Sequence, residues 1–183
     1  FSYALVKAGY SVVAADVDSR GFSVSNIPFH AVDLNKPFSC KLGFDLYDSV
    51  VIVEGIEHLE NPWEFLRECR RIIKPGGILI LSSPNVECFL SRIVFFLTGS
   101  FLTFDRTMSN PNHITPIFSW LLNHALVRAG FQLMETGFAA EGWAAQHNWK
   151  YWLVSKVQSL ICPLLSEAKR GEIRIVVAKS IES

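Results

Sequence analysis

The sequence predicts an α/β fold in which a doubly wound, mostly parallel sheet is covered by helices on both faces. Two observations predict it. Short apolar segments alternate with amphipathic segments along the chain, with short turns between them. The best strand candidates are apolar at nearly every position, as parallel strands buried between helices are. The sequence shows no internal repeat and no linker, so we expect residues 1–183 to form a single domain.

Composition excludes several other classes of protein. Half of the residues are apolar and 19% are charged, which excludes disorder over most of the chain. The 17 basic and 17 acidic residues balance, so no overall positive field attracts nucleic acid, and we expect no nucleic-acid partner. The most apolar run, residues 93–104, is shorter than the about 20 residues that span a bilayer. Four cysteines without a C-x-x-C pair, and no signal-peptide pattern, predict a cytoplasmic protein.

The elements in the first half of the chain follow from apolar patterning and from helix-boundary residues. Gly9 ends a first helix, and Asn61 with Pro62 begins another, since these residue types are common at a cap and at the first helical position. In chain order, we expect the last part of a helix at residues 2–9 and strands at 11–16, 28–34 and 49–53. A helix should then run from residue 61 to the turn at 75–77, followed by a strand at 78–83.

The second half contains two longer segments between its regular elements. We expect a helix from Thr115 and Pro116 to Gly130, and strands at 131–137 and 172–179. Residues 84–116, rich in Phe, are expected to form a lid over the substrate. Residues 138–171 are expected to form a Trp-rich helical insertion. Within it, residues 143–165 favour a helix packed on the sheet, with a peripheral membrane or lipid contact and a dimer contact as alternatives.

Acidic residues end two successive predicted strands. Parallel sheets bind ligands at the carboxyl ends of their strands. A carboxylate such as Asp16 accepts two hydrogen bonds from a ribose diol, and Asp33 can accept from an adenine amino group while the Leu34 N–H donates to a ring nitrogen. Taken singly, each aspartate is equally well explained as a turn former.

Four segments in order make a more specific pattern: VVAADVD, AVDLNKPF, YDSVVIVEGIEHLENP and RRIIKPGGILILSSPN. Together they closely resemble the class I S-adenosylmethionine-dependent methyltransferases, in particular the small-molecule branch. TPIFSWLLNHALVRAGF and GEIRIVVAK resemble later segments of the same family. The resemblance implies a Rossmann-like sheet with a final antiparallel strand, S-adenosylmethionine as cofactor and S-adenosylhomocysteine as product.

The resemblance also implies roles for individual residues. Six would contact the cofactor: Asp16 at the ribose, Val17 at the adenine face, Asp33 and Leu34 at the adenine edge, and Glu54 and Gly55 beside the methionine portion.

The acceptor side has three further candidates. His58 is a candidate base, since its pKa lies near neutrality, with the alternative that it and Glu57 fix the loop. Asn85 and His113 are candidates for contact with the acceptor, and His113 is equally well explained as a loop or cap residue. The five histidines are scattered along the sequence, so we expect no metal site.

One feature of that family is absent. No G-x-G-x-G loop occurs in the sequence, and a helix is already under way at Ser2. We therefore expect the first strand and its loop to lie upstream of Phe1, and this N-terminally truncated chain to have a gap in its sheet with unpaired edges. The Phe-rich lid predicts a small, apolar or amphipathic methyl acceptor. An NAD(P)-dependent oxidoreductase and a degenerate, non-catalytic fragment are the alternatives. The sequence does not indicate the oligomeric state.

Overall fold

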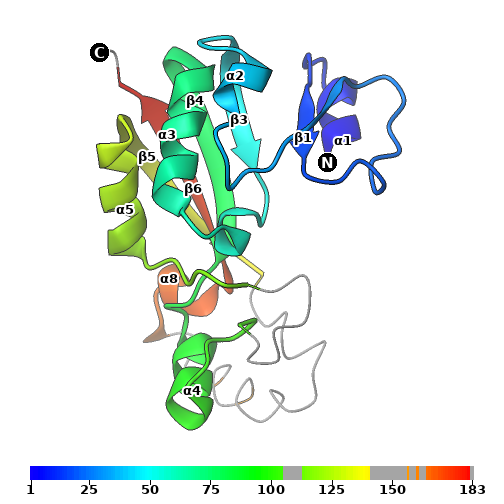
Figure 1. The fold of residues 1–183 in the computed structure, drawn as a ribbon. Helices are drawn as coiled ribbons and strands as arrows, with labels where there is room; N and C mark the ends of the chain where they lie inside the picture. Colours follow the sequence, from blue (N-terminus) through cyan, green and yellow to red (C-terminus); the bar gives the residue numbers. More distant parts are fainter. Residues whose placement is uncertain (105–112, 141–155, 157–159, 161–163, 182–183) are drawn as a thin grey trace.

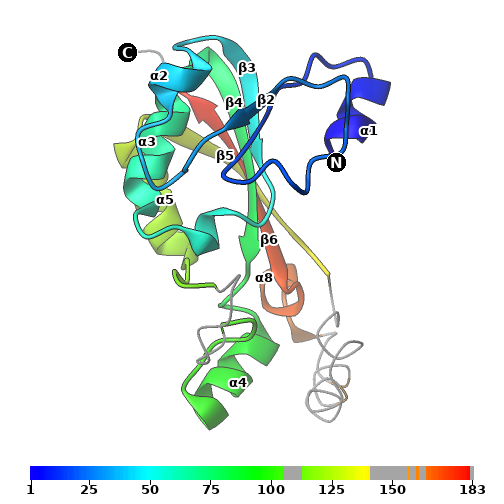
Figure 2. The same ribbon diagram turned by 45° about the vertical axis from the view of Figure 1, so that its right-hand side comes forward.

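The computed structural model describes residues 1–104, 113–140, 156, 160 and 164–181. Figures 1 and 2 show its helices and strands from two directions. In chain order they are α1 (Ser2–Lys7), β1 (Ala14–Asp16), β2 (Phe29–Ala31), α2 (Ser39–Leu42), β3 (Tyr47–Ile52), the 3-10 helix η1 (Ile56–His58), α3 (Pro62–Ile72), β4 (Ile73–Pro84), α4 (Phe89–Thr98), α5 (Ser119–Arg128), β5 (Phe131–Ala139), α8 (Glu167–Arg170) and β6 (Ile173–Ser180).

The strands form two sheets. β1 pairs with β2 in parallel. The other sheet has the order β3-β4-β6-β5, in which β3 and β4 are parallel and β6 is antiparallel to both β4 and β5. The predicted antiparallel final strand is therefore confirmed, and it lies between β4 and β5.

The sheet is interrupted between β1 and β3, where the sequence analysis expects a gap. In the described part of the chain, β1 pairs only with β2 and β3 pairs only with β4. Figure 1 shows α1 and β1 set apart from the four-stranded sheet. The open edge leaves Val53, directly after β3, 56% exposed, whereas the sequence predicts a strand buried on both sides.

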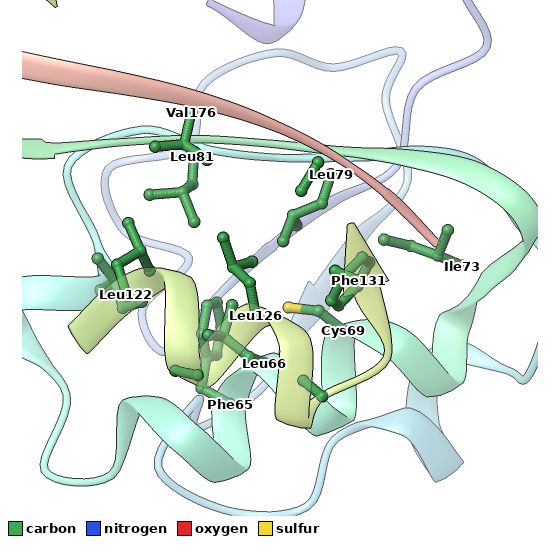
Figure 3. Close-up of a cluster of buried hydrophobic side chains, with 14 of the residues drawn as sticks. Phe65, Leu66, Cys69, Ile73, Leu79, Leu81, Leu122, Leu126, Phe131 and Val176 are labelled. Atoms are coloured by element: carbon green, nitrogen blue, oxygen red, sulfur yellow. The ribbon is translucent and has the colours of Figure 1, made fainter. Parts of the chain in front are cut away.

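Helices α3 and α5 pack on one face of the four-stranded sheet, and their apolar side chains meet those of β4 and β6 (Figure 3). Burial alternates along β6: Arg174, Val176 and Ala178 are buried, while Ile175 and Lys179 on the opposite face are exposed. Among the described residues, α3 and α5 therefore cover this one face of the sheet. The main core comprises Leu66 and Cys69 of α3, Leu122 and Leu126 of α5, and Leu79, Leu81, Phe131 and Val176 of the sheet.

α3 begins at the residues that the sequence predicts from its cap and first turn, whereas α5 begins later than predicted. The Asn61 side chain accepts a hydrogen bond from the Glu64 N–H, and Pro62 occupies the first helical position. α5 begins at Ser119 instead of at Thr115 and Pro116. The N–H of Thr115 donates to the Glu57 carbonyl and its hydroxyl donates to the Leu59 carbonyl. These bonds to η1 hold the segment before α5 out of the helix.

Glu68 fixes the start of α2 against α3. Its buried carboxylate accepts hydrogen bonds from the backbone N–H groups of Phe38 and Ser39, both at 2.7 Å, and forms an ion pair with Arg71. Burial raises the pKa of this carboxyl, but hydrogen bonds from Ser39, Arg71 and Phe38 outweigh that effect and lower the pKa overall. The charged form is therefore the one that stabilises the fold.

Replacing Glu68 by Gln should lower the free energy of unfolding by about 1.5–3 kcal/mol at pH 7, because hydrogen bonds to a charged acceptor are lost. Since the folded pKa is depressed, the charge of Glu68 stabilises the fold above the unfolded pKa, near 4.3, and this stability is lost as pH falls through the folded value. Urea unfolding at several pH values measures it, with exposed Glu135→Gln as control. An equal loss at neutral and acid pH would contradict this account.

Candidate active site

The loop after β3 is tied to the end of β4 by a reciprocal pair of hydrogen bonds. The backbone N–H of Glu54 donates to Ser82 Oγ at 3.1 Å, and the Ser82 hydroxyl donates to Glu54 Oε1 at 2.9 Å. Glu54 adopts a left-handed backbone conformation, with φ of 47°. Burial raises the pKa of its carboxyl. At Gly55 an added Cβ would lie 3.2 Å from Ile52 Cγ2, so the backbone passes closely over the strand.

The two aspartates at the ends of β1 and β2 both make turn hydrogen bonds. Asp16 Oδ1 accepts from the Val17 N–H at 2.6 Å. Asp33 Oδ1 accepts from the Asn35 N–H at 3.0 Å, and Oδ2 forms an ion pair with Lys36 at 3.0 Å. The hydrogen bond from Lys36, followed by that from Asn35, lowers the pKa of Asp33. Asp16 is exposed and Asp33 partly so, and a carboxylate has room for further donors.

Hydrogen bonds between neighbouring segments bring these strand ends together. The Val32 N–H donates to the Asp16 carbonyl at 2.9 Å. The Glu60 N–H donates to Asn35 Oδ1 at 2.8 Å, which ties the end of β2 to the loop after η1. The Leu34 side chain packs against the main core and so anchors its own peptide. The predicted cofactor residues after β2 therefore lie beside the loop that follows η1.

Three ionisable side chains meet near this loop: Glu57 and His58, which closely follow Glu54 in the sequence, and His113, which comes from a distant segment. The rings of His58 and His113 lie edge to face, with centroids 4.7 Å apart. His113 Nε2 lies 3.9 Å from Glu57 Oε1. The backbone explains the meeting, because the N–H groups of Ile114 and Thr115 both donate to the Glu57 carbonyl. His58 and His113, which are far apart in the sequence, are therefore neighbours in the fold.

Burial changes the pKa of two members of this cluster, which comprises Glu57, His58 and His113. Glu57 is completely buried, and neither of its carboxyl oxygens has a hydrogen-bond partner among the described residues. Burial, with a smaller contribution from the charge of Glu54, raises the pKa of Glu57 to about 7. Burial, and then the charge of His58, lowers the pKa of His113. The His113 imidazole is therefore neutral at pH 7.

Asn85 has a structural role instead of the predicted role in acceptor binding. It is buried, and its side-chain NH₂ donates to the carbonyls of Ala168 and Gly171, both at 2.8 Å. Its Oδ1 accepts from the Glu87 N–H at 3.1 Å. Both amide hydrogens are thus used to hold the end of β4 to α8, so we omit Asn85 from the site.

Aromatic rings connect α4 with the cluster. Phe95 of α4 stacks on Phe101 at 4.5 Å, Phe101 meets Phe104 edge to face at 6.3 Å, and Phe104 lies 5.3 Å from the His113 ring. Residues 105–112 of the predicted lid lie outside the described residues. So does most of the 138–171 insertion, including Trp143, Trp149 and Trp152. Among the residues that are described, no helix is long and apolar enough to cross a membrane.

Glu57 and Thr103 join the predicted residues at the site. Glu57 and Glu54 are three residues apart, a spacing that was visible in EGIEH. Thr103 Oγ1 lies 3.1 Å from His113 Nδ1. Nothing in the sequence marks that contact, because it depends on how the segment after α4 folds back.

Comparison with known proteins relates the first part of the chain to methyltransferases. Residues 1–81 match the model of a methyltransferase domain family. A probable S-adenosylmethionine-dependent methyltransferase of Mycolicibacterium smegmatis is 34% identical over 89 residues, 49% of this chain and 30% of that protein. A ubiquinone biosynthesis O-methyltransferase of Caulobacter vibrioides is 29% identical over 90 residues, 44% of this chain and 35% of that protein. The chain thus spans about a third of the length of these relatives.

Solved structures show the same fold over nearly the whole chain. A SAM-dependent methyltransferase from Archaeoglobus fulgidus superposes with a TM-score of 0.69 at 20% identity, covering 97% of this chain and 80% of that one. A SAM-dependent methyltransferase from Methanosarcina mazei gives 0.63 at 16% identity, covering 100% and 88%. Residues 1–81 thus match a methyltransferase domain family, and the chain shares the Rossmann-like fold of SAM-dependent methyltransferases.

Proposed function

We propose that the protein transfers a methyl group from S-adenosylmethionine to a small, apolar or amphipathic acceptor. The observation that carries this proposal is the series of carboxylates Asp16, Asp33 and Glu54. Asp16 is the last residue of β1, and Asp33 and Glu54 come two residues after β2 and β3, in a fold that methyltransferases share. Such strand ends are where doubly wound sheets bind nucleotide-like ligands. The sequence match, which includes Asp16, Asp33 and Glu54, supports the same cofactor.

The described residues fit this cofactor. Asp16 is exposed and offers acceptor sites to a ribose diol. Val17 beside it is 68% exposed, an apolar side chain that an adenine ring would cover. The Asp33 carboxylate can accept a hydrogen bond from the adenine amino group. Gly55 has no side chain, so the methionine portion can approach its backbone closely. In this assignment Glu54, held by Ser82, would orient the amino end of that portion.

The bound cofactor supplies an activated methyl group on a sulfonium. The chain has to align the acceptor and exclude water, and alignment alone can contribute about 7–11 kcal/mol to lowering the barrier. His58 and His113, whose rings lie edge to face, are the candidate proton acceptors for an acceptor hydroxyl. The low pKa of His113 keeps its imidazole neutral and able to accept a proton.

The aromatic rings from Phe95 to Phe104 support an apolar or amphipathic acceptor. They run from α4 to His113, so an apolar ring or chain packed on them would present a polar group to the imidazoles. Relatives named ubiquinone biosynthesis O-methyltransferases are consistent with an oxygen as the methylated atom. We further propose a cytoplasmic location and no nucleic-acid partner. For residues 143–165 we propose a helix packed on the sheet, and contact with a membrane or lipid is the alternative.

Calorimetric titration of S-adenosylhomocysteine into the full-length protein tests the proposal. We expect binding in the micromolar range, and transfer of labelled methyl from S-adenosylmethionine to hydroxylated apolar aromatics. Binding of NADH in place of S-adenosylhomocysteine would replace the proposal with the oxidoreductase alternative. A folded protein that binds neither would favour the non-catalytic scaffold. Methylation confined to RNA or protein would contradict the acceptor class.

A further inference from the structure

The Glu57 carboxylate is in an unusual position for a buried acid. It is fully buried, and both of its oxygens are without a hydrogen-bond partner in the described part of the chain. A buried carboxylate normally either receives several hydrogen bonds or coordinates a metal ion, because otherwise its desolvation is costly. Oε1 instead faces an imidazole nitrogen, Nε2 of His113, at 3.9 Å.

The cluster offers two imidazoles and one carboxylate around a common point. One potential ligand atom from each of Glu57, His58 and His113 lies within 4.8 Å of the other two. Two imidazoles with a carboxylate form a ligand set of catalytic zinc sites, and similar sets bind other divalent transition metals. Ligand atoms on one zinc lie ~3.3 Å apart, so small side-chain rotations would bring these three into coordination.

The second nitrogen of His113 is already held in the way that metal-bound histidines require. Its Nδ1 lies 3.1 Å from Thr103 Oγ1. When Nδ1–H donates to that hydroxyl, the lone pair of Nε2 faces Glu57. A hydrogen bond of this kind fixes the tautomer and ring orientation of a ligating histidine. Thr103 thus belongs with the cluster as a positioning residue.

We infer that Glu57, His58 and His113 bind a divalent transition-metal ion of the zinc type. Three protein ligands leave one coordination position open, as in catalytic zinc sites. Glu57 and His58 closely follow Glu54 in the sequence, so the site belongs to the loop at which the proposed function places the acceptor. With both imidazoles bound to the metal, a hydroxyl bound there would release its proton to water instead of to His58 or His113, because the cation stabilises the oxyanion. This last consequence rests on the proposed function, whereas metal binding does not.

Titration of the full-length protein with Co²⁺, followed by its visible absorption and by competition with Zn²⁺, tests the inference. We expect one site, weakened at least about tenfold in His113→Ala and in Glu57→Gln. Glu57→Gln keeps the backbone carbonyl to which Ile114 and Thr115 donate, so the fold should survive. His124→Ala, in α5 and outside the cluster, is the matched control and should bind normally.

Thr103→Ala gives a second, milder test, since loss of a supporting hydrogen bond typically weakens metal binding about 10–100-fold. Circular dichroism verifies that each variant is folded. Absence of Co²⁺ binding, binding unchanged by His113→Ala, or a thiolate band that disappears in Cys40→Ser would each overturn the inference. S-adenosylhomocysteine titration in metal-free buffer separates the two proposals, because its failure contradicts the proposed function and leaves the metal site intact.

Discussion

Replacing Arg174 by Met is expected to lower the free energy of unfolding by about 3–5 kcal/mol, because it removes a buried cation together with its ion pair and its hydrogen bonds to the Ile117 carbonyl and Ser119. Arg174 of β6 is 1% exposed. Its guanidinium donates to the Ile117 carbonyl at 2.6 Å, to Ser119 Oγ at 2.8 Å and to Glu87 Oε2 at 3.2 Å. Burial lowers the pKa of this guanidinium and the charge of Glu87 opposes that change.

The expected loss of stability is large because Arg174 connects three segments of the chain. One side chain joins the last strand to the turn before α4 and to the start of α5. Glu87 in turn accepts from the N–H and the hydroxyl of Ser119. Loss of Arg174 would therefore also loosen the segment from His113 to Ser119, on which the candidate active site depends.

Urea unfolding measures the loss, and Arg128→Met, an exposed arginine of α5, is the control that should change little. A double-mutant cycle with Glu87→Gln sharpens the test. The double variant should lose less than the sum of the single losses, by about 0.5–3 kcal/mol, because the two groups interact directly. A loss below about 1 kcal/mol in Arg174→Met, which is the range of exposed ion pairs, would contradict the assigned role.

The second large effect is expected on the affinity for the cofactor. Asp16→Ala should weaken binding of S-adenosylhomocysteine by about 1.5–3 kcal/mol, or roughly 10- to 150-fold, because charged hydrogen bonds to the ribose are lost. Stability should change little, since Asp16 is exposed and its bond to Val17 is local.

Calorimetric titration of S-adenosylhomocysteine into the unmodified protein and into Asp16→Ala measures this effect. Asp18→Ala is a close control, because Asp18 is an exposed aspartate two residues away that pairs with Arg20 at 2.7 Å. Unchanged affinity in Asp16→Ala would remove Asp16 from the site. An equal loss in both variants would indicate a general effect of charge and not a ribose contact.

Several features of this protein could be predicted from the sequence because they depend on neighbouring residues. Asn61 and Pro62 begin α3 as expected, since a cap needs only the first turn of its own helix. The acids at the strand ends, Asp16 and Asp33, follow from short apolar strands that stop at a polar residue. The antiparallel position of the last strand came from the family resemblance, and the structure confirms it.

Other features depend on contacts between distant segments, and only the tertiary structure decided them. His58 and His113 meet because the Glu57 carbonyl accepts from the N–H groups of Ile114 and Thr115. The same bonds move the start of α5 to Ser119, where local propensity would allow an earlier start. Asn85 has the residue type of a binding group, yet its amide is used by the carbonyls of Ala168 and Gly171. A sequence shows which groups a side chain carries, whereas the partner of each group is determined by which backbone the fold brings within hydrogen-bond distance.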